Sequence, residues 1–400
     1  MDDHAYRQLK DRVFAAIWDE LAPLESDIED RESLPYDKIM PVLRRVGAFG
    51  FLVPPEYGGH GLTIRQYLPI IAEFAKIQGG IRVVVHVHNS FAHAMSELAS
   101  ATQRGALLPG IATGDKSVAF ALTEPDHGTG ADLGSTAVLD GSDYVVNGRK
   151  WLITNSDLAS HFLVMAKTAP AEVTSILVER DRPGLTIEPL PETMGCKGGE
   201  HGLLTFTDVR VPATNLVGKP GEGQDNLERA LEISRVFIAA SSLGTGQHAF
   251  DLSLRHARSR VTFGRPIAQR QAIQRYLAEM AMDLQALRLM LDDAAAKWDA
   301  GRRIPAEASL VKLFGLEAVG RVTDRALLVH GGIGYTRRHP IERLYRDARL
   351  NWLEEGTPTI QYMVAAREFL AGYWWTDEFA GAAHPAGSSA GDSAGDLVAD

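Results

Sequence analysis

The sequence predicts an α+β protein of several domains. We expect an N-terminal α-helical domain at residues 1–116, a middle antiparallel β-barrel or sandwich domain at 117–222, a C-terminal helical bundle at 223–375 and a disordered tail at 376–400. Apolar residues recur at helical spacing on both sides of the middle segment, and short apolar runs separated by Gly and Pro fill that segment. The chain length of 400 residues suits two or three domains.

Helical periodicity is clearest in two regions. In the first region the i, i+4 and i, i+3, i+4, i+7 patterns are formed by Leu9, Val13, Ile17 and Leu21, by Ile39, Val42, Leu43 and Val46, and by Tyr67, Ile70, Ile71 and Phe74. In the second region a heptad stripe is formed by Ile273, Leu277, Met280, Leu284, Leu287 and Leu291. No residue of this stripe is polar, so we interpret it as the core face of a bundle helix.

The middle segment has the signals of short strands. The run 137–146 contains the turn dipeptide Asp140-Gly141, and further runs follow at 162–165, 175–178 and 203–206. Gly and Pro separate these runs, which favours a small antiparallel barrel or sandwich. The last segment, 376–400, consists largely of Ala, Gly, Ser and Asp and has little to bury, so we expect disorder there.

Composition and charge exclude several classes. The net charge is −10 with scattered basic residues, which argues against binding to nucleic acid or to an anionic membrane. No apolar run is long enough to span a bilayer. The single cysteine, Cys196, cannot form a disulfide within the chain, so we expect a cytoplasmic protein. His86, His88 and His93 lie close together, but their spacing matches no zinc site, so we expect no metal.

Two adjacent acids, Glu354 and Glu355, precede the turn residues Gly356 and Thr357 at the start of a helical pattern. An acid in this position is a candidate general base if apolar surroundings raise its pKa. The same acids could simply favour the helix N-terminus through its dipole. These few residues leave both interpretations open.

The surrounding sequence resembles the acyl-CoA dehydrogenase family. The resemblance rests on the run 330–336, the run 342–349 and Leu353-Glu354-Glu355-Gly356-Thr357, and it extends over about residues 5–372 in the family's domain order. It implies a C-terminal four-helix bundle and Glu355 as the catalytic base, with Glu354 where the family usually has an aromatic residue. Some members place their base at the position of Ser234, and Ser at that position favours Glu355.

The resemblance also implies an FAD site. Leu-Thr-Glu-Pro at 122–125 places Thr123 beside the flavin, Thr154 is implied to donate to flavin N5, and Arg260 and Gln271 are implied to clamp the FAD of a neighbouring subunit. The family's Trp falls at Leu152, so Trp151 is expected to face the other way. The implied cofactor residues are Phe120, Leu122, Thr123, Thr129, Leu152, Ile153, Thr154, Arg260, Thr262, Phe263, Gln271, His330, Gly331, Gly332, Gly356, Thr357 and Thr359.

The implied reaction is oxidation of an acyl-CoA thioester to the trans-2-enoyl thioester. Electrons would pass from FAD to an electron-transferring flavoprotein, and the protein would be a homotetramer or homodimer. The implied substrate residues are Thr129, Glu232, Ser234, Arg235, Glu355 and Arg367. Alternatives are the same chemistry on an acyl group tethered to a carrier protein, reoxidation by oxygen, and a flavin- or CoA-binding relative without turnover.

Overall fold

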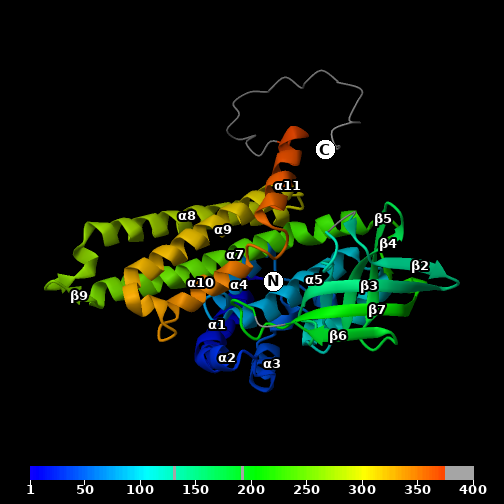
Figure 1. The fold of residues 1–400 in the computed structure, drawn as a ribbon, viewed down its shortest axis with the longest axis horizontal. Helices are drawn as coiled ribbons and strands as arrows, with labels where there is room; N and C mark the ends of the chain where they lie inside the picture. The colour runs from blue at the N-terminus through cyan, green and yellow to red at the C-terminus, as the bar shows by residue number, and fades with distance from the viewer. Residues whose placement is uncertain (129–131, 191–192, 374–400) are drawn as a thin grey trace.

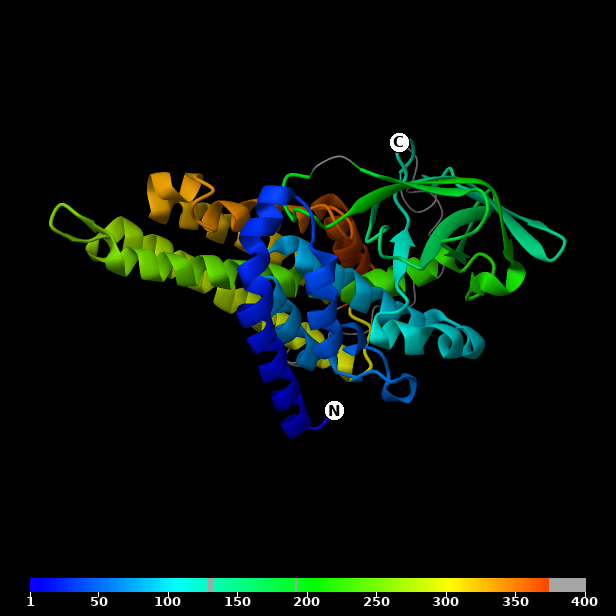
Figure 2. The same cartoon turned by 90° about the horizontal axis from the view of Figure 1, so that it is seen from below.

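The computed structural model describes residues 1–128, 132–190 and 193–373 (Figure 1). The molecule is elongated: the β-sheet lies at one end and the tip of a long helical hairpin lies at the other, in both views (Figures 1 and 2). The predicted fold class is confirmed, with helices before and after a β-sheet region. The expected tail lies outside the described residues, as does Thr129.

The first region is helical. Its helices are α1 (Asp3–Ala16), α2 (Glu25–Arg31), α3 (Tyr36–Arg45), α4 (Ile64–Phe74), α5 (Gly79–Leu98) and α6 (Ala101–Thr113), and α1 runs into a π-helical turn at Ile17–Leu21. Side chains fix the starts of several helices. Thr63 and Ser100 each form a capping box with a glutamine three residues later. The Gln78 side chain accepts hydrogen bonds from Gly80 and Ile81, which begins α5.

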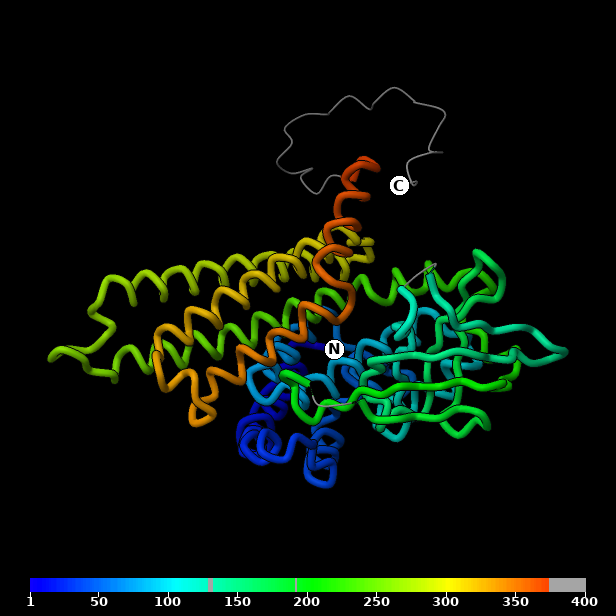
Figure 3. Tube along the Cα trace, viewed as in Figure 1, coloured from blue at the N-terminus to red at the C-terminus, as the bar shows by residue number. Residues whose placement is uncertain are grey.

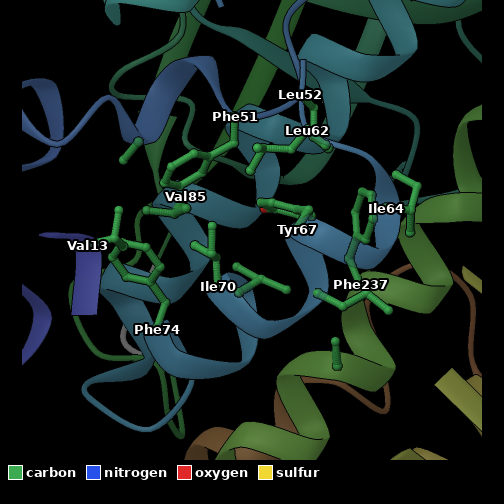
Figure 4. Packing of buried hydrophobic residues seen from close by; sticks show 14 of the residues in the cluster. Val13, Phe51, Leu52, Leu62, Ile64, Tyr67, Ile70, Phe74, Val85 and Phe237 are labelled. Atoms are coloured by element: carbon green, nitrogen blue, oxygen red, sulfur yellow. The ribbon is translucent and has the colours of Figure 1, made fainter. Parts of the chain in front are cut away.

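The predicted apolar faces form the core of this region. Leu9, Val13, Ile17 and Leu21 are all buried, and so are Tyr67, Ile70, Ile71 and Phe74. Figure 4 shows Tyr67 and Phe74 packed with Phe51 of a connecting segment and with Phe237 of a C-terminal helix. One continuous core therefore joins the N-terminal helices to the bundle.

The middle region is one twisted sheet. Its strands are β1 (Val118–Ala121), β2 (Thr136–Asp140), β3 (Asp143–Thr154), β4 (His161–Ala169), β5 (Glu172–Glu179), β6 (Leu185–Pro189), β7 (His201–Pro212) and β8 (Leu216–Val217). The order is β6-β7-β3-β2-β4-β5-β8, with β1 added beside β4. Most pairs are antiparallel, as expected, but β4 pairs in parallel with both β1 and β2. The sheet is thus mixed rather than wholly antiparallel, because β1 enters from the preceding helices in the direction of β4.

The C-terminal region contains α7 (Gly223–Ser259), α8 (Gln271–Asp299), α9 (Pro305–His330), α10 (Ile341–Leu350) and α11 (Pro358–Leu370). Figure 3 shows α7, α8 and α9 side by side, with α11 projecting from the bundle. At the hairpin tip, β9 (Val261–Thr262) pairs with β10 (Arg265–Pro266). In the predicted heptad stripe Met280, Leu284, Leu287 and Leu291 are buried, which confirms its interpretation as core.

The contact between α4 and α7 leaves no room for a side chain at Gly244. A Cβ there would lie 1.8 Å from the carbonyl oxygen of Ala72. We therefore expect Gly244→Ala to lower the free energy of unfolding by about 2 kcal/mol or more, because backbone must move. Gly105 is a matched control in α6, where a Cβ would meet nothing within 4 Å. Gly105→Ala should be neutral or stabilising by up to about 1 kcal/mol.

Urea unfolding of the two alanine variants checks this prediction. Equal midpoints for both variants would contradict the close helix contact.

Candidate active site

Glu355 lies in the turn between α10 and α11. Its backbone has a positive φ of 57°, and Gly356 follows with φ 89°. The Ser234 hydroxyl of α7 donates to Oε1 of Glu355 at 3.0 Å, and Nε2 of His86 on α5 lies 3.7 Å from the same oxygen. The Glu355 side chain is 11% exposed. The acid is therefore held at the junction of two helices and keeps a small opening to the outside.

Buried donors hold the backbone of this turn. Nζ of Lys312 on α9 donates to the carbonyl oxygens of Glu354 and Gly356, the latter at 2.5 Å. The Gln361 amide donates to the carbonyl oxygens of Glu355 at 2.9 Å and Gly356 at 3.0 Å. A left-handed backbone is costly for a residue with a side chain, so these bonds fix a conformation that Glu355 would rarely adopt by itself.

The expected rise in the pKa of Glu355 is not found. Burial raises the pKa of this carboxyl, but His86, Lys312 and the Ser234 hydroxyl together lower it by more, so the net pKa is below the ordinary value. The carboxylate is consequently ionised at neutral pH and can accept a proton. The pKa of Lys312 is lowered to about 8, mainly by burial.

The neighbouring acid has a different partner. Glu354 accepts a hydrogen bond from the guanidinium of Arg82 at 3.0 Å, and Arg82 is 3% exposed. Arg82 also donates to Asn351 at 3.0 Å and contacts the Cys196 thiol. Burial raises the pKa of that thiol well above its ordinary value, so Cys196 is an unreactive core residue. Glu354 is thus part of a structural ion pair, whereas no Lys or Arg of the described residues forms an ion pair with Glu355.

The other substrate residues expected from the sequence lie in different surroundings. Arg235 is buried beside Glu355, and burial lowers its pKa. Glu232 is also buried, but it binds Nε of Arg303 at 2.7 Å and the backbone of Ile304. Arg367 is half exposed on α11 and pairs with Glu228 at 3.2 Å. The structure thus brings Ser234 and Arg235 to Glu355, whereas Glu232 and Arg367 bind other protein groups.

A buried ion pair shapes the β-side of the site. Nζ of Lys150 on β3 donates to Glu124 at 2.7 Å and to the carbonyl oxygen of Leu122 at 3.0 Å. Glu124 also accepts hydrogen bonds from the backbone of Gly134 and Ser135. Burial lowers the pKa of Lys150 to about 8. The pair fixes the loop that carries Thr123, and sequence reasoning missed it because its members are 26 residues apart.

A β-bulge follows this pair on β3. The pairing of β3 with β7 shifts register between Lys150 and Ile153, and Leu152 has a φ of 56°. Trp151 and Leu152 are 38% and 43% exposed. We expected Trp151 to face away from Leu152 because side chains alternate along a strand. Alternation does not hold across a bulge, so it does not determine which way Trp151 faces. Beyond the bulge Ile153 is buried and Thr154 pairs with His201.

Three further residues expected to contact flavin lie near the sheet and at the start of α11. Near the sheet, Phe120 stacks on Phe91 of α5 with ring centroids 4.9 Å apart. At the start of α11, Thr357 and Thr359 are exposed, and the Thr357 side chain makes no capping bond. Their hydroxyls are available to a ligand.

A distal group lies at the hairpin tip, at the opposite end of the molecule from the sheet (Figure 1). Phe263 is 95% exposed there, and Arg260 and Gln271 are exposed. A Cβ at Gly331 or Gly332 would meet nothing within 4 Å, so the backbone there is open to close approach. The distal group and the β-sheet therefore lie at opposite ends of one chain (Figure 1).

His330, also expected to bind the cofactor, belongs to a cluster of histidine rings next to this tip. Its ring lies 4.4 Å from the ring of His256 and 4.4 Å from that of His339, measured between centroids. It is buried, and its Nδ1 bonds the carbonyl oxygen of Ala326 at 2.8 Å. His330 directly precedes the Gly331–Tyr335 turn, and its buried ring supports the start of that turn.

Several residues of the site were not identified from sequence as site residues. Arg82, His86 and Ser90 recur every four residues along α5, and their partners are Glu354, Glu355 and Ser234 respectively. The i, i+4, i+8 spacing places these three polar residues on one face of the helix, and this spacing was the available signal. Lys312 gave no comparable signal, since a single lysine in a helix is common.

Two further properties concern the described residues only. None of their helices combines the length and the apolar composition needed to cross a membrane. Within 1–128, 132–190 and 193–373, no group of three or more His, Cys, Asp or Glu side chains is arranged to hold a metal ion.

The sequence matches three domain families. They are described as acyl-CoA dehydrogenase, N-terminal domain at residues 3–115, middle domain at 119–209 and C-terminal domain at 221–370. Among curated proteins, the chain is 35% identical to an acryloyl-CoA reductase (NADH) of Anaerotignum propionicum, covering 90% of this chain and 92% of the relative. It is 33% identical to an acyl-CoA dehydrogenase of Bacillus subtilis, covering 88% and 94%. It is also 33% identical to the caffeyl-CoA reductase-Etf complex subunit CarC of Acetobacterium woodii, covering 84% and 90%.

Solved structures agree. The butyryl-CoA dehydrogenase of Megasphaera elsdenii superposes with a TM-score of 0.88 at 28% identity, over 92% of this chain and 99% of that one. An acyl-CoA dehydrogenase of Bacillus anthracis complexed with FAD gives a TM-score of 0.84 at 30% identity, over 92% and 67%. These likenesses define the class, an oxidoreductase with the fold of FAD-dependent enzymes. The chain belongs to the acyl-CoA dehydrogenase family and is an enzyme.

The buried Lys150–Glu124 pair provides a test of the β-side of the site. Both side chains are almost fully buried. Lys150→Met should lower the free energy of unfolding by about 3–5 kcal/mol, because Glu124 keeps its charge without a cation. The adjacent Arg149 pairs with Asp126 at the surface, where their side chains are 50% and 60% exposed. Arg149→Met should therefore cost under about 1 kcal/mol.

Denaturant unfolding followed by far-UV circular dichroism measures both effects. A loss for Lys150→Met no larger than that for Arg149→Met would show that the pair does not fix this loop.

Proposed function

We propose that this protein is an FAD-dependent acyl-CoA dehydrogenase with Glu355 as the catalytic base. The observation that carries the proposal is the ionised carboxylate of Glu355, which is held by Ser234 and still partly exposed. The substrate is a CoA thioester whose α-carbon reaches Oε of Glu355. In this role the carboxylate takes one α-proton and becomes neutral.

The chain's own groups favour this proton transfer. The backbone N–H of Glu355 forms no hydrogen bond with another described residue, so it is available to a thioester oxygen. A donor at that oxygen stabilises the negative charge that develops as the α-proton leaves. Lys312 and Arg235 add positive charge near the carboxylate. Burial between α5, α7 and α9 keeps water away from the reacting atoms.

The residues present fit FAD. Thr123, Thr154, Thr357 and Thr359 supply hydroxyl and backbone groups on one chain, and the exposed Trp151 and Leu152 supply apolar surface beside them. Bound FAD supplies a two-electron acceptor for the β-hydrogen of the substrate. On a second chain, Arg260 and Gln271 offer a cation and an amide to a diphosphate, and Gly331 and Gly332 allow close approach. We therefore propose a homodimer or homotetramer in which FAD lies between subunits.

An electron-transferring flavoprotein is the proposed partner. The relative from Acetobacterium woodii is a subunit of a complex with such a protein. Cys196 is buried and is the only cysteine of the chain, so no disulfide can form within the chain. Proteins without disulfides are typical of the cytoplasm, which remains the proposed location.

The reverse reaction is a second candidate. The relative at 35% identity is an acryloyl-CoA reductase, and the same residues can reduce a 2-enoyl thioester by microscopic reversibility. Glu355 would then deliver the α-proton instead of accepting it. Anaerobic mixing of the reduced protein with 2-enoyl-CoA, followed by the return of flavin absorbance, compares the two directions.

Substitution of the two acids separates chemistry from stability. Glu355→Gln should fold and bind FAD but reduce the rate of flavin bleaching by an acyl-CoA by about 10²–10⁴-fold, because an amide cannot take the proton. Glu354→Gln should bleach within about tenfold of the parent rate but lower the free energy of unfolding by about 1–3 kcal/mol, because buried Arg82 loses its charged partner.

Anaerobic stopped-flow spectroscopy and urea unfolding of both variants provide the measurements. If Glu354→Gln is the variant that fails to bleach, the wrong acid has been assigned as the base.

The shared FAD site predicts that cofactor retention depends on assembly. Arg260→Ala should lose FAD on gel filtration at least about tenfold more readily than the parent, because a charge-assisted contact to the diphosphate is removed. Arg258 lies two residues earlier on the same helix end and is also exposed. Arg258→Ala is the matched control and should retain FAD.

Light scattering and the ratio of flavin to protein absorbance follow both properties together. A stable monomer of the parent protein that keeps its full FAD complement would refute the assignment of Arg260 to a second subunit.

A further inference from the structure

His86 is a fully buried histidine whose ring has no hydrogen-bond partner. Its side chain is 0% exposed, and neither ring nitrogen bonds another described residue. Burial of an unpaired polar group is unfavourable, because the hydrogen bonds to water are lost and not replaced. Such a group in a folded protein requires an explanation, and a role in the site is one.

The neighbouring histidine on the same helix shows the contrast. His88 is also buried on α5, but its Nε2 bonds the carbonyl oxygen of Ile111 at 2.9 Å. Its ring packs edge-on against Phe49, with centroids 4.7 Å apart. His88 is a satisfied core residue, and burial lowers its pKa to about 4. His86 is not satisfied in this way.

The position of His86 points to Glu355. The two lie on different elements, α5 and the turn before α11, and Nε2 of His86 is 3.7 Å from Oε1 of Glu355. A shift of less than about 1 Å brings this pair to hydrogen-bond distance. The ring of Phe237 stands nearly perpendicular to the His86 ring at 84°, which limits its movement from the α7 side.

Every element around Glu355 contributes a polar or charged group. They are His86 from α5, Ser234 and Arg235 from α7, Lys312 from α9 and Glu354 from the turn itself. Lys312 is bound to carbonyl oxygens of the turn, and Glu354 is bound to Arg82. Among the described residues, Arg235 forms no ion pair with Glu355, and the groups that contact its carboxylate are Ser234 at 3.0 Å and His86 at 3.7 Å.

We propose that His86 is a positioning residue for the reaction. In the working enzyme its Nε2–H donates to Oε1 of Glu355, holds the carboxylate in one orientation and keeps it ionised before the substrate arrives. This inference rests on the proposed function, in which Glu355 is the base. It assigns His86 no contact with the substrate or the cofactor.

The direction of the pH effect follows from the electrostatics. Burial alone raises the pKa of Glu355, and His86 is the largest of the groups that lower it. Without His86, the pKa of Glu355 should be higher. The carboxylate would then be protonated, and unable to act as a base, at a higher pH. The acid limb of the rate profile should therefore move to higher pH, and the rate at high pH, where Glu355 is ionised in either protein, should change little.

The experiment compares three variants of the FAD-loaded protein: His86→Leu removes the donor, His86→Gln keeps one, and His88→Leu is the matched control on the same helix. The measurement is the second-order rate of flavin bleaching by an acyl-CoA across pH, which reports the free enzyme. At the acid end we expect His86→Leu to be slower on the order of tenfold, with its high-pH plateau within about threefold of the parent. His86→Gln should restore most of the acid limb, and His88→Leu should leave it unchanged.

A stability measurement gives a result that does not depend on turnover. His86→Leu should unfold close to the temperature of the parent, because the lost pairing with Glu355 is offset by burial of an apolar side chain in place of the imidazole, and His88→Leu should unfold at a lower temperature because the carbonyl oxygen of Ile111 loses its partner. Glu355→Gln alone and in the His86→Leu background completes a double-mutant cycle, and the two changes should be non-additive.

The outcomes distinguish a failure of the role proposed for His86 from a failure of the proposed function. An unshifted acid limb in His86→Leu, with the parent active, overturns the role of His86 and leaves the proposed function intact. If no acyl-CoA bleaches the parent, the proposed function fails, and additivity in the thermal cycle then also overturns the pairing. If His86→Leu does not fold, His86→Ala, which also removes the donor, replaces it in both measurements.

Discussion

The site depends on the confinement of one carboxylate in a strained turn. Glu355 has a left-handed backbone conformation and lies where α5, α7 and α9 meet. Lys312 and Gln361 bind three successive carbonyl oxygens of the turn, and this network offsets the unfavourable conformation of Glu355. Each helix that packs in the core thus also fixes an atom of the site. A change in the packing of these helices would therefore also change the geometry around Glu355.

The two ends of the molecule have separate roles. The turn of Glu355 and the loop fixed by Lys150 belong to one half, whereas Arg260 and the Gly331–Tyr335 turn lie at the distant tip of the bundle. The two sets are well separated within one chain (Figure 1). This geometry is the physical reason to propose that assembly and cofactor binding are coupled. The exposed apolar side chain of Phe263 also lies at the tip.

Most of the fold could be predicted from periodicity. The apolar sets around Leu9 and Tyr67 are buried as expected, because local spacing decides which face of a helix meets the core. The predicted stripe is buried from Met280 to Leu291, whereas Ile273 and Leu277 near the hairpin tip are half-buried. The parallel pairing of β4 could not be predicted, because strand order is set by contacts far apart in sequence. Alternation also misled at Trp151, because a bulge interrupts β3.

The site was partly predictable for similar reasons. The resemblance identified Glu355, but not its net electrostatics. Burial was expected to raise its pKa, and Lys312 and His86, distant in sequence, reverse the result. His86 entered the sequence analysis only as a possible metal ligand. Glu354, at a position where the family usually has an aromatic residue, binds the buried Arg82 and so has a structural role.

The most direct test of the central claim is an anaerobic titration of the FAD-loaded protein with a panel of acyl-CoAs of different length and branching, while the flavin absorbance is recorded. The account predicts that at least one acyl-CoA bleaches the flavin and yields the corresponding 2-enoyl-CoA. A protein with a full FAD complement that no acyl-CoA bleaches, and whose reduced form no 2-enoyl-CoA reoxidises, would contradict it.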